Sequence, residues 1–121
     1  MMLRIDHVQL AIPKGSEDLC RLFYVDLLGM TEIPKPETLA GRGGLWLQSG
    51  EIQLHLGVED DFRPARKAHP AFAVAEIDQY SIRFMKNGFT PVWDDAIPGI
   101  RRFYVSDPVG NRIEFIGRTI P

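Results

Sequence analysis

The sequence predicts an α+β fold in which two βαβββ modules form a single domain of 121 residues. Three observations support this fold class. Each half of the chain has one segment with helical periodicity among several short segments with strand periodicity. The order of these segments repeats after about sixty residues. The composition, 45% hydrophobic and 25% charged, is typical of a globular domain with its own core.

The first module is predicted to span approximately residues 1–57. Residues 5–12 alternate between apolar and polar side chains, which indicates a strand that ends at Pro13. A helix follows, with Ser16 at its N-cap and Gly29 at its end. The apolar residues at helical spacing are Leu19, Leu22, Phe23 and Leu27. Three strands are predicted to complete the module, at residues 30–33, 45–48 and 52–56.

The second module is predicted to span residues 68–121, after a linker at residues 58–67. Its strand at residues 70–75 leads into a helix at residues 78–87, which Gly88 ends. The side chains expected to face inward from this helix are Ile77, Ser81, Phe84 and Met85. Strands at residues 89–93, 102–106 and 112–116 follow, the last two joined by the turn Asp107-Pro108-Val109-Gly110.

Equivalent glycines fix the alignment of the two modules. Gly29 and Gly88 end the two helices, and Gly50 and Gly110 lie in the two hairpin turns. Each of these pairs has nearly the same separation in the chain, which equals the period of the repeat. The modules therefore align with almost no insertion, which is typical of an internal repeat.

Charge and hydropathy exclude several classes of partner. The formal net charge is −2 and no stretch is rich in Lys and Arg, which argues against a nucleic-acid partner. Apolar runs fall short of the roughly 18 residues that a membrane span needs, so no membrane partner is expected. The first residues lack the pattern of a signal peptide, which indicates a cytoplasmic location. A single cysteine, Cys20, excludes an intrachain disulfide.

The three histidines and one carboxylate occupy equivalent positions in the two modules. The alignment pairs His7 with His69, and His55 with Glu114. Strand alternation places each of them on the face opposite its apolar neighbours. We expect the two sheets to form a cup in which these side chains converge on one divalent metal ion per site, of Zn, Ni, Mn, Co or Fe.

Simpler interpretations of these residues stay open at this point. Each histidine alone is more often a half-buried, hydrogen-bonded side chain than a metal ligand. Glu114 alone could pair across strands with Arg102 or Arg112. His55 is the least needed of the four, since two histidines and one carboxylate already complete a common metal triad.

Several other side chains are expected to line the same face. The residues predicted to bind the substrate are Gln9, Trp46, Gln53 and Arg102. Trp46 could stack on a flat ligand, although an aromatic residue at strand spacing is as often part of the core.

Three motifs link the chain to a known superfamily. They are Ile5-Asp6-His7-Val8, the helix end Phe23-Tyr24-Val25-Asp26-Leu27-Leu28-Gly29-Met30, and the segment from Phe103 to Phe115 with Asp107-Pro108-x-Gly110 followed by Glu114. In these motifs the chain resembles the vicinal oxygen chelate superfamily, which includes glyoxalase I, fosfomycin-resistance transferases, extradiol dioxygenases and bleomycin-resistance proteins. The resemblance covers essentially the whole chain.

The resemblance implies a homodimer in which each site is shared between two chains. His7, His69 and Glu114 correspond to the metal ligands of the family. In glyoxalase I-like members a fourth ligand, usually glutamate, stands where this chain has His55. This departure leaves open whether His55 is a ligand, a base or neither.

The function implied is that of a glyoxalase-like, divalent-metal-dependent enzyme that chelates and polarises a small oxygenated substrate. Its reaction could be that of a lyase, an isomerase, a thiol transferase or a dioxygenase, with Glu114 or His55 as the proton acceptor. The alternative is a metal-free protein that sequesters a small molecule or drug, as bleomycin-resistance proteins do. A domain that acts only through protein contacts has less support.

Overall fold

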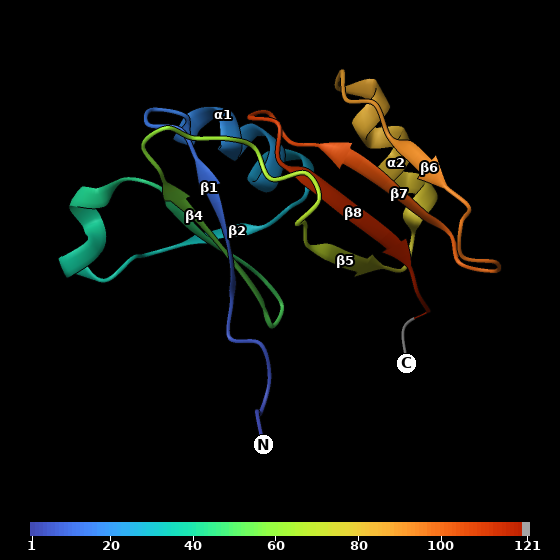
Figure 1. Cartoon of the computed structure of the whole chain (residues 1–121), viewed down its shortest axis with the longest axis horizontal. Helices are drawn as coiled ribbons and strands as arrows, with labels where there is room; N and C mark the ends of the chain where they lie inside the picture. The colour runs from blue at the N-terminus through green and yellow to red at the C-terminus, as the bar shows by residue number, and fades with distance from the viewer. Residues whose placement is uncertain (120–121) are drawn as a thin grey trace. The chain divides into compact units, whose positions relative to one another are not determined.

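The computed structural model describes residues 1–119 and divides into two compact units, Met1–Pro64 and Ala65–Pro121. Each unit contains one four-stranded mixed sheet (Figure 1). The two sheets have the same topology, which confirms the predicted α+β fold of two βαβββ modules. The boundary between the units falls inside the segment predicted as the linker. The single-domain organisation and the cup stay predictions.

The sheet of the first unit has the strand order β1-β4-β3-β2. Its strands are β1 (Val8–Ile12), β2 (Thr31–Ile33), β3 (Leu45–Ser49) and β4 (Ile52–Val58). β1 runs parallel to β4, and the other neighbouring pairs are antiparallel. One face of the sheet is apolar and buried. Its side chains include Leu10, Ile12, Leu45, Leu47, Leu54 and Leu56.

The parallel pairing sets the start of β1 and the end of β4, which differ from the predicted strands at residues 5–12 and 52–56. The register begins with Val8 opposite Leu54 and ends with Ile12 opposite Val58. Residues 5–7 therefore lie before the paired region, and β4 extends into the predicted linker. Periodicity alone does not show where a strand's partner begins, so it could not fix these ends.

The first helical segment begins as α1 (Glu17–Arg21) and continues as a π-helix, η1 (Leu22–Leu27). Its buried side chains are Cys20, Phe23 and Tyr24. Leu19 and Leu22 are 46% and 57% exposed, so they do not belong to the packed stripe, contrary to the predicted spacing. The segment has two overlapping apolar stripes, and the one that buries both aromatic rings removes more apolar surface from water.

Two local features of the first unit differ from the prediction. Ser16 occupies the N-cap of α1, but its hydroxyl donates to the backbone oxygen of Pro13 at 2.6 Å and makes no capping hydrogen bond. A 3₁₀-helix, η2 (Glu37–Arg42), interrupts the connection from β2 to β3 and is the teal coil in Figure 1. No pattern in the sequence predicts this turn.

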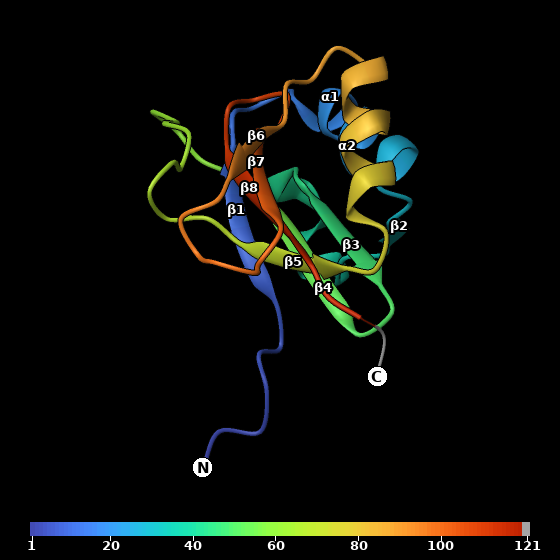
Figure 2. The same ribbon diagram turned by 90° about the vertical axis from the view of Figure 1, so that its right-hand side faces the viewer.

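The second unit repeats the topology with the strand order β5-β8-β7-β6. Its elements are β5 (Ala71–Val74), α2 (Ile77–Lys86), β6 (Val92–Asp94), β7 (Arg102–Ser106) and β8 (Arg112–Gly117). α2 lies along one side of the sheet (Figure 2). β6 begins later than predicted because its pairing with β7 starts at Val92.

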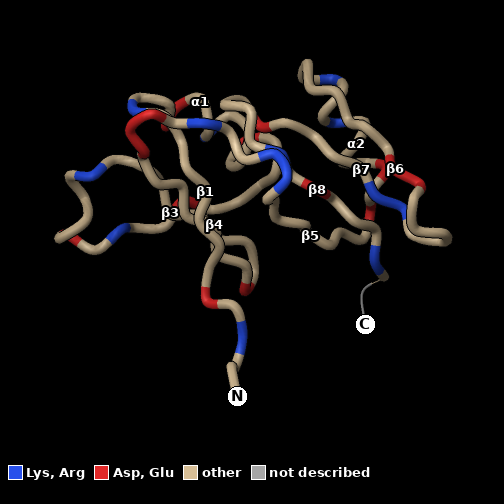
Figure 3. Tube along the Cα trace, viewed as in Figure 1, with Lys and Arg blue, Asp and Glu red and all other residues tan. Residues whose placement is uncertain are grey.

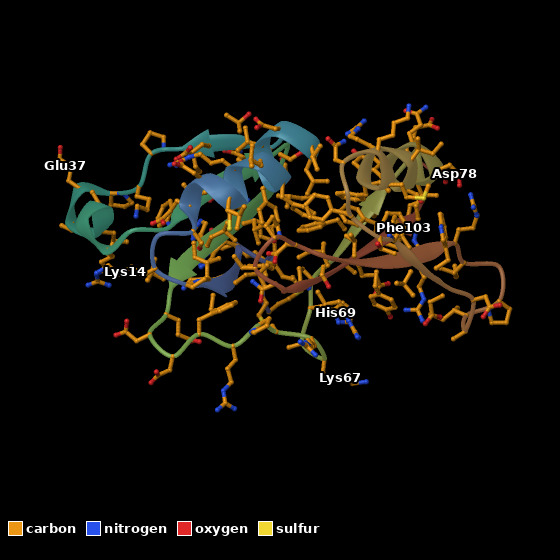
Figure 4. The ribbon with its side chains drawn as sticks, turned by 90° about the horizontal axis from the view of Figure 1, so that it is seen from above. Lys14, Glu37, Lys67, His69, Asp78 and Phe103 are labelled. Atoms are coloured by element: carbon orange, nitrogen blue, oxygen red, sulfur yellow. The ribbon has the colours of Figure 1, made fainter. Side chains whose placement is uncertain are left out.

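The core of the second unit lies between α2 and the sheet. Phe84 of α2 packs against Phe103 and Phe115, with ring centroids 6.0 and 5.3 Å away. Figure 4 shows Phe103 between its strand and the helix. Ile77 and Ser81 are buried as predicted, but Met85 is 57% exposed, so its inward placement was wrong. Met85 follows Phe84 by one residue, which rotates it about 100° away from the packed stripe.

The turn between β7 and β8 is built on two buried polar side chains. Oδ1 of Asp107 accepts hydrogen bonds from the backbone nitrogens of Val109 and Asn111, at 3.0 and 2.8 Å. Oδ1 of Asn111 accepts one from the backbone nitrogen of Ala65 at 2.8 Å. These bonds fix the start of β8, the strand that carries Glu114.

Within residues 1–119, no helix has the length and apolar character needed to cross a membrane.

Candidate metal-binding site

The face of the second sheet that points away from α2 is polar. Strand alternation places Phe103 and Phe115 toward the helix, and therefore Arg102, Tyr104 and Glu114 on the opposite face. Tyr104 and Glu114 are direct cross-strand neighbours. Figure 3 shows charged residues of both signs on the adjacent strands β6, β7 and β8. Three strands of this face therefore contribute to one cluster of polar groups.

Glu114 and His69 form the centre of this cluster. Nε2 of His69 lies 2.9 Å from Oε1 of Glu114, and Glu114 is only 6% exposed. Nδ1 of His69 donates to the backbone oxygen of Lys67 at 2.8 Å, just before β5, where Figure 4 labels both residues. The bond to a carbonyl puts a proton on Nδ1, which leaves Nε2 as the nitrogen that faces the carboxylate.

Arg102 forms a hydrogen bond with Oε2, the second carboxylate oxygen of Glu114. Its Nη1 donates to Oε2 of Glu114 at 3.4 Å and to the hydroxyl of Tyr104 at 3.1 Å, and its Nη2 donates to Asp94 at 3.0 Å. The side chain is 14% exposed, and its Nε is buried with no hydrogen-bond partner among the described residues. Arg102 was predicted to bind the substrate, and that assignment stays a prediction. The structure places the guanidinium beside Glu114.

Tyr104 and Asp94, the other partners of Arg102, were not among the residues predicted from the sequence. Alternation along β7 puts residues 102 and 104 on the same face, so the signal for Tyr104 was present. Asp94 could not be found in this way, because its position depends on the pairing of β6 with β7.

The first sheet also has a polar face, which carries most of the predicted substrate-binding residues. The pairing places Gln9 and Trp46 on either side of His55, on neighbouring strands. Gln53 lies two residues before His55 on β4 and therefore on the same face. The side chain of Gln9 lies over Gly57, where an added Cβ would stand 2.7 Å from Nε2 of Gln9. The structure thus gathers Gln9, Trp46 and Gln53 around one histidine.

His55 lies between two other rings. Its centroid is 4.0 Å from that of Trp46, with 6° between the ring planes, and 4.1 Å from that of His7, with 14° between the planes. Nε2 of His55 lies 3.3 Å from Oε1 of Gln53. Burial, and secondarily the nearby His7, lower the pKa of His55 below its ordinary value. His55 is therefore a neutral ring in a three-ring stack at neutral pH.

His7 lies one residue before β1, in the first unit. Its Nδ1 lies 3.0 Å from Oδ2 of Asp6, and this hydrogen bond lowers the pKa of the Asp6 carboxyl. His7 and His69 thus share one feature: an oxygen atom engages Nδ1, so Nε2 is the nitrogen that would bind a metal. Such an oxygen partner is common for histidine ligands, because it orients the ring.

The donor atoms of the second unit fit a divalent metal ion. With metal–nitrogen and metal–oxygen bonds of about 2.0–2.2 Å, octahedral coordination places adjacent ligand atoms about 3 Å apart. The separation of 2.9 Å between His69 and Glu114 matches that spacing. An imidazole and a carboxylate suit the predicted set of Zn, Ni, Mn, Co and Fe.

The other two predicted ligands form a different arrangement. His7 and His55 are brought together in the first unit, but their nearly parallel planes do not meet at a point within bonding distance of both rings. Within residues 1–119, no group of three or more His, Cys, Asp or Glu side chains could hold a metal ion. His69 and Glu114 therefore form a close pair in the second unit, and His7 lies in the first unit.

Comparison with known proteins identifies the family. The chain is 50% identical to a protein from Bacillus anthracis described as a glyoxalase family protein, with a TM-score of 0.94 and 98% of each chain covered. It is 17% identical to a variant of the fosfomycin resistance protein FosX from Listeria monocytogenes, in complex with Mn(II) and 1S,2S-dihydroxypropylphosphonic acid. The TM-score is 0.81, with 99% of this chain and 95% of that chain covered.

A third structure is lactoylglutathione lyase from Agrobacterium tumefaciens, which is 20% identical, with a TM-score of 0.68 and 91% of each chain covered. The protein-family models and the curated proteins gave no match. The chain belongs to the glyoxalase family, in the vicinal oxygen chelate superfamily that its motifs indicate. FosX and the lyase share its fold.

Proposed function

We propose that the protein is a divalent-metal-dependent enzyme that acts on a small oxygenated substrate, with His7, His69 and Glu114 as the metal ligands. The observation that carries the proposal is the approach of Nε2 of His69 to Oε1 of Glu114, at 2.9 Å on a sheet face that points away from the core. Membership of the glyoxalase family and the Mn(II) complex of FosX add support.

Several groups of the chain would hold the proposed metal ligands in position. The backbone oxygen of Lys67 and the carboxylate of Asp6 orient the two histidines through Nδ1. Arg102 occupies Oε2 of Glu114, which leaves Oε1 as the oxygen available to a metal. A bound divalent ion supplies Lewis acidity, which polarises oxygen atoms of the substrate.

The residues predicted to bind the substrate offer suitable groups for a small oxygenated molecule. The amides of Gln9 and Gln53 can donate to substrate oxygens, Trp46 offers an aromatic face, and Arg102 adds a positive charge. Proton transfer by Glu114 or His55 stays a prediction. Exchange of either residue to Gln would test it by a loss of turnover in variant protein that still holds its metal.

Metal analysis tests the proposal. We expect the purified protein to retain or take up one Zn²⁺, Mn²⁺ or similar ion per site, and His69→Ala or Glu114→Ala to weaken binding by at least about tenfold. Glu37→Ala, an exposed acidic residue, is the matched control. Wild-type protein that binds no metal, yet binds a small ligand tightly, would support the sequestering alternative.

We also propose that each site takes His7 from one chain and His69 and Glu114 from a second copy. Mixing His7→Ala chains with His69→Ala chains tests this arrangement. In a mixed dimer, one site would combine the intact His7 of one chain with the intact His69 of the other, so metal binding should return to half of its sites. Mixtures that stay as inactive in metal binding as either variant would contradict the shared site.

The reaction itself is open among a lyase, an isomerase, a thiol transferase and a dioxygenase. Thiol adducts of glyoxals, fosfomycin with a thiol, and catechols each present two oxygens to a metal. Turnover of one of these substrates, dependent on the added metal and lost in Glu114→Ala, would assign the reaction class.

A further inference from the structure

We propose that His55 is a positioning residue: its ring, packed between Trp46 and His7, fixes the imidazole of His7 so that Nε2 is presented to a metal ion. The inference rests on the proposed function in one respect, the role of His7 as a ligand. It differs from the sequence-based expectation that His55 is itself a ligand or a base.

The position of His7 in the fold creates the need for such support. The β1–β4 ladder begins at Val8, so the backbone of His7 lies outside the paired strand. Its side chain is 40% exposed. A histidine in this position would otherwise exchange among rotamers, which weakens a ligand that must point in one direction.

Two contacts restrict the ring of His7. The carboxylate of Asp6 engages Nδ1 at 3.0 Å, which fixes one edge of the ring. The ring of His55 covers one face, with centroids 4.1 Å apart. An edge contact and a face contact together define the orientation of a planar group.

His55 is suited to this role because its own position is rigid. It is 5% exposed, lies in the middle of β4 and is backed by Trp46 at 4.0 Å. Its Nε2 is engaged by Gln53. The stacked geometry also opposes direct ligation, since the planes of His7 and His55 are tilted by only 14°.

Two substitutions of His55 distinguish a positioning role from a role as a metal ligand. His55→Phe keeps a flat ring in the stack but removes both nitrogens, and His55→Leu removes the ring. If His55 positions His7, we expect His55→Phe to bind Zn²⁺ or Mn²⁺ within about threefold of the wild type and His55→Leu to bind it about ten- to a hundredfold more weakly. Equal losses in both variants would show that a ring nitrogen of His55 matters and the stacking does not, and equal retention would show that the stack is unimportant. Either result overturns the inference.

NMR spectroscopy of the metal-free protein tests the positioning role of His55 separately from the proposed function. The ring protons of His7 should show an upfield ring-current shift in wild-type protein and in His55→Phe, and lose it in His55→Leu. Trp46→Leu provides a second variant that reduces the shift by releasing His55. Unchanged His7 resonances in a folded His55→Leu variant would refute the positioning role. Wild-type protein that binds no metal would refute the proposed function and leave the resonance test intact.

Discussion

Nε2 of His69 lies 2.9 Å from Oε1 of Glu114, although the two residues are far apart in the chain. The contact forms because β5 runs parallel to β8, which places the end of the segment before β5 beside the middle of β8. Nε2 of an imidazole and a carboxylate oxygen are both atoms that can bind a divalent ion. His69 and Glu114 would supply two neighbouring ligand atoms to a bound divalent ion, and the free energy of binding would then add to the stability of the fold.

Metal addition should therefore stabilise the fold through this pair. At a free Zn²⁺ or Mn²⁺ concentration of about 100 times the dissociation constant, the free energy of unfolding should rise by about 2.7 kcal/mol. Glu114→Gln should fold but gain about half of this amount or less, because its metal affinity is at least about tenfold weaker. Chemical denaturation with and without metal measures the effect. A similar gain in Glu114→Gln and in the control Glu37→Gln would show that the ion binds elsewhere.

The fold could be predicted from the sequence because its signals are local and repeated. Gly29 and Gly88 end equivalent helices, and the alternation around Glu114 placed its side chain on the open face. The same alternation could not give the distance to His69, which depends on the register of two distant strands. The sequence therefore indicated which residues share a face, and the pairing determined which of them touch.

The ring stack of the first unit could not be predicted from the sequence for the same reason. His7, Trp46 and His55 come from three separate segments, and their stacking requires both the parallel pairing of β1 and the antiparallel pairing of β3. Treated singly, each was a reasonable ligand or substrate contact. Only their parallel planes suggest that His55 supports His7.

Asp107 should be a strong determinant of stability. Its Oδ1 accepts two backbone hydrogen bonds, at 3.0 and 2.8 Å, and the residue is 4% exposed. Asp107→Ala leaves two backbone N–H groups without this acceptor, so we expect a loss of about 1–3 kcal/mol in the free energy of unfolding. Asp107→Asn keeps an acceptor oxygen and should lose less. Urea denaturation compares the two variants, and equal losses would show that charge, not hydrogen bonding, stabilises the turn.

Gly44 should not tolerate a side chain. Its φ is +82°, and an added Cβ would stand 2.1 Å from the backbone oxygen of Leu56. Gly50 has a similar φ of +57° but no heavy atom within 4 Å of an added Cβ, so it is the matched control. Gly50→Ala should cost about 1–2 kcal/mol from backbone strain alone, and Gly44→Ala about 1–3 kcal/mol more. Equal thermal shifts for the two variants would contradict the predicted clash.

The ion pair between α1 and β2 should make stability depend on pH in the acid range. Arg21 binds both oxygens of Glu32, from Nε at 2.9 Å and from Nη2 at 3.0 Å. The hydrogen bond from Arg21 lowers the pKa of Glu32 below 4.5. A carboxyl group whose pKa is lower in the folded state binds fewer protons there than in the unfolded state. Its contribution is therefore complete above the unfolded pKa and is lost as the pH falls through the folded value.

Glu32→Gln should remove this contribution. Both side chains are about 40% exposed, so solvent screening limits the loss at neutral pH to about 0.5 kcal/mol. The difference in free energy of unfolding between the wild type and Glu32→Gln should shrink as the pH falls from about 5 to about 3, because the protonated Glu32 no longer pairs with Arg21. Denaturation at a series of pH values measures this difference, with Glu51→Gln as an exposed control. A difference that stays constant across this range would show that the Arg21–Glu32 pair does not contribute to the pH dependence of the free energy of unfolding.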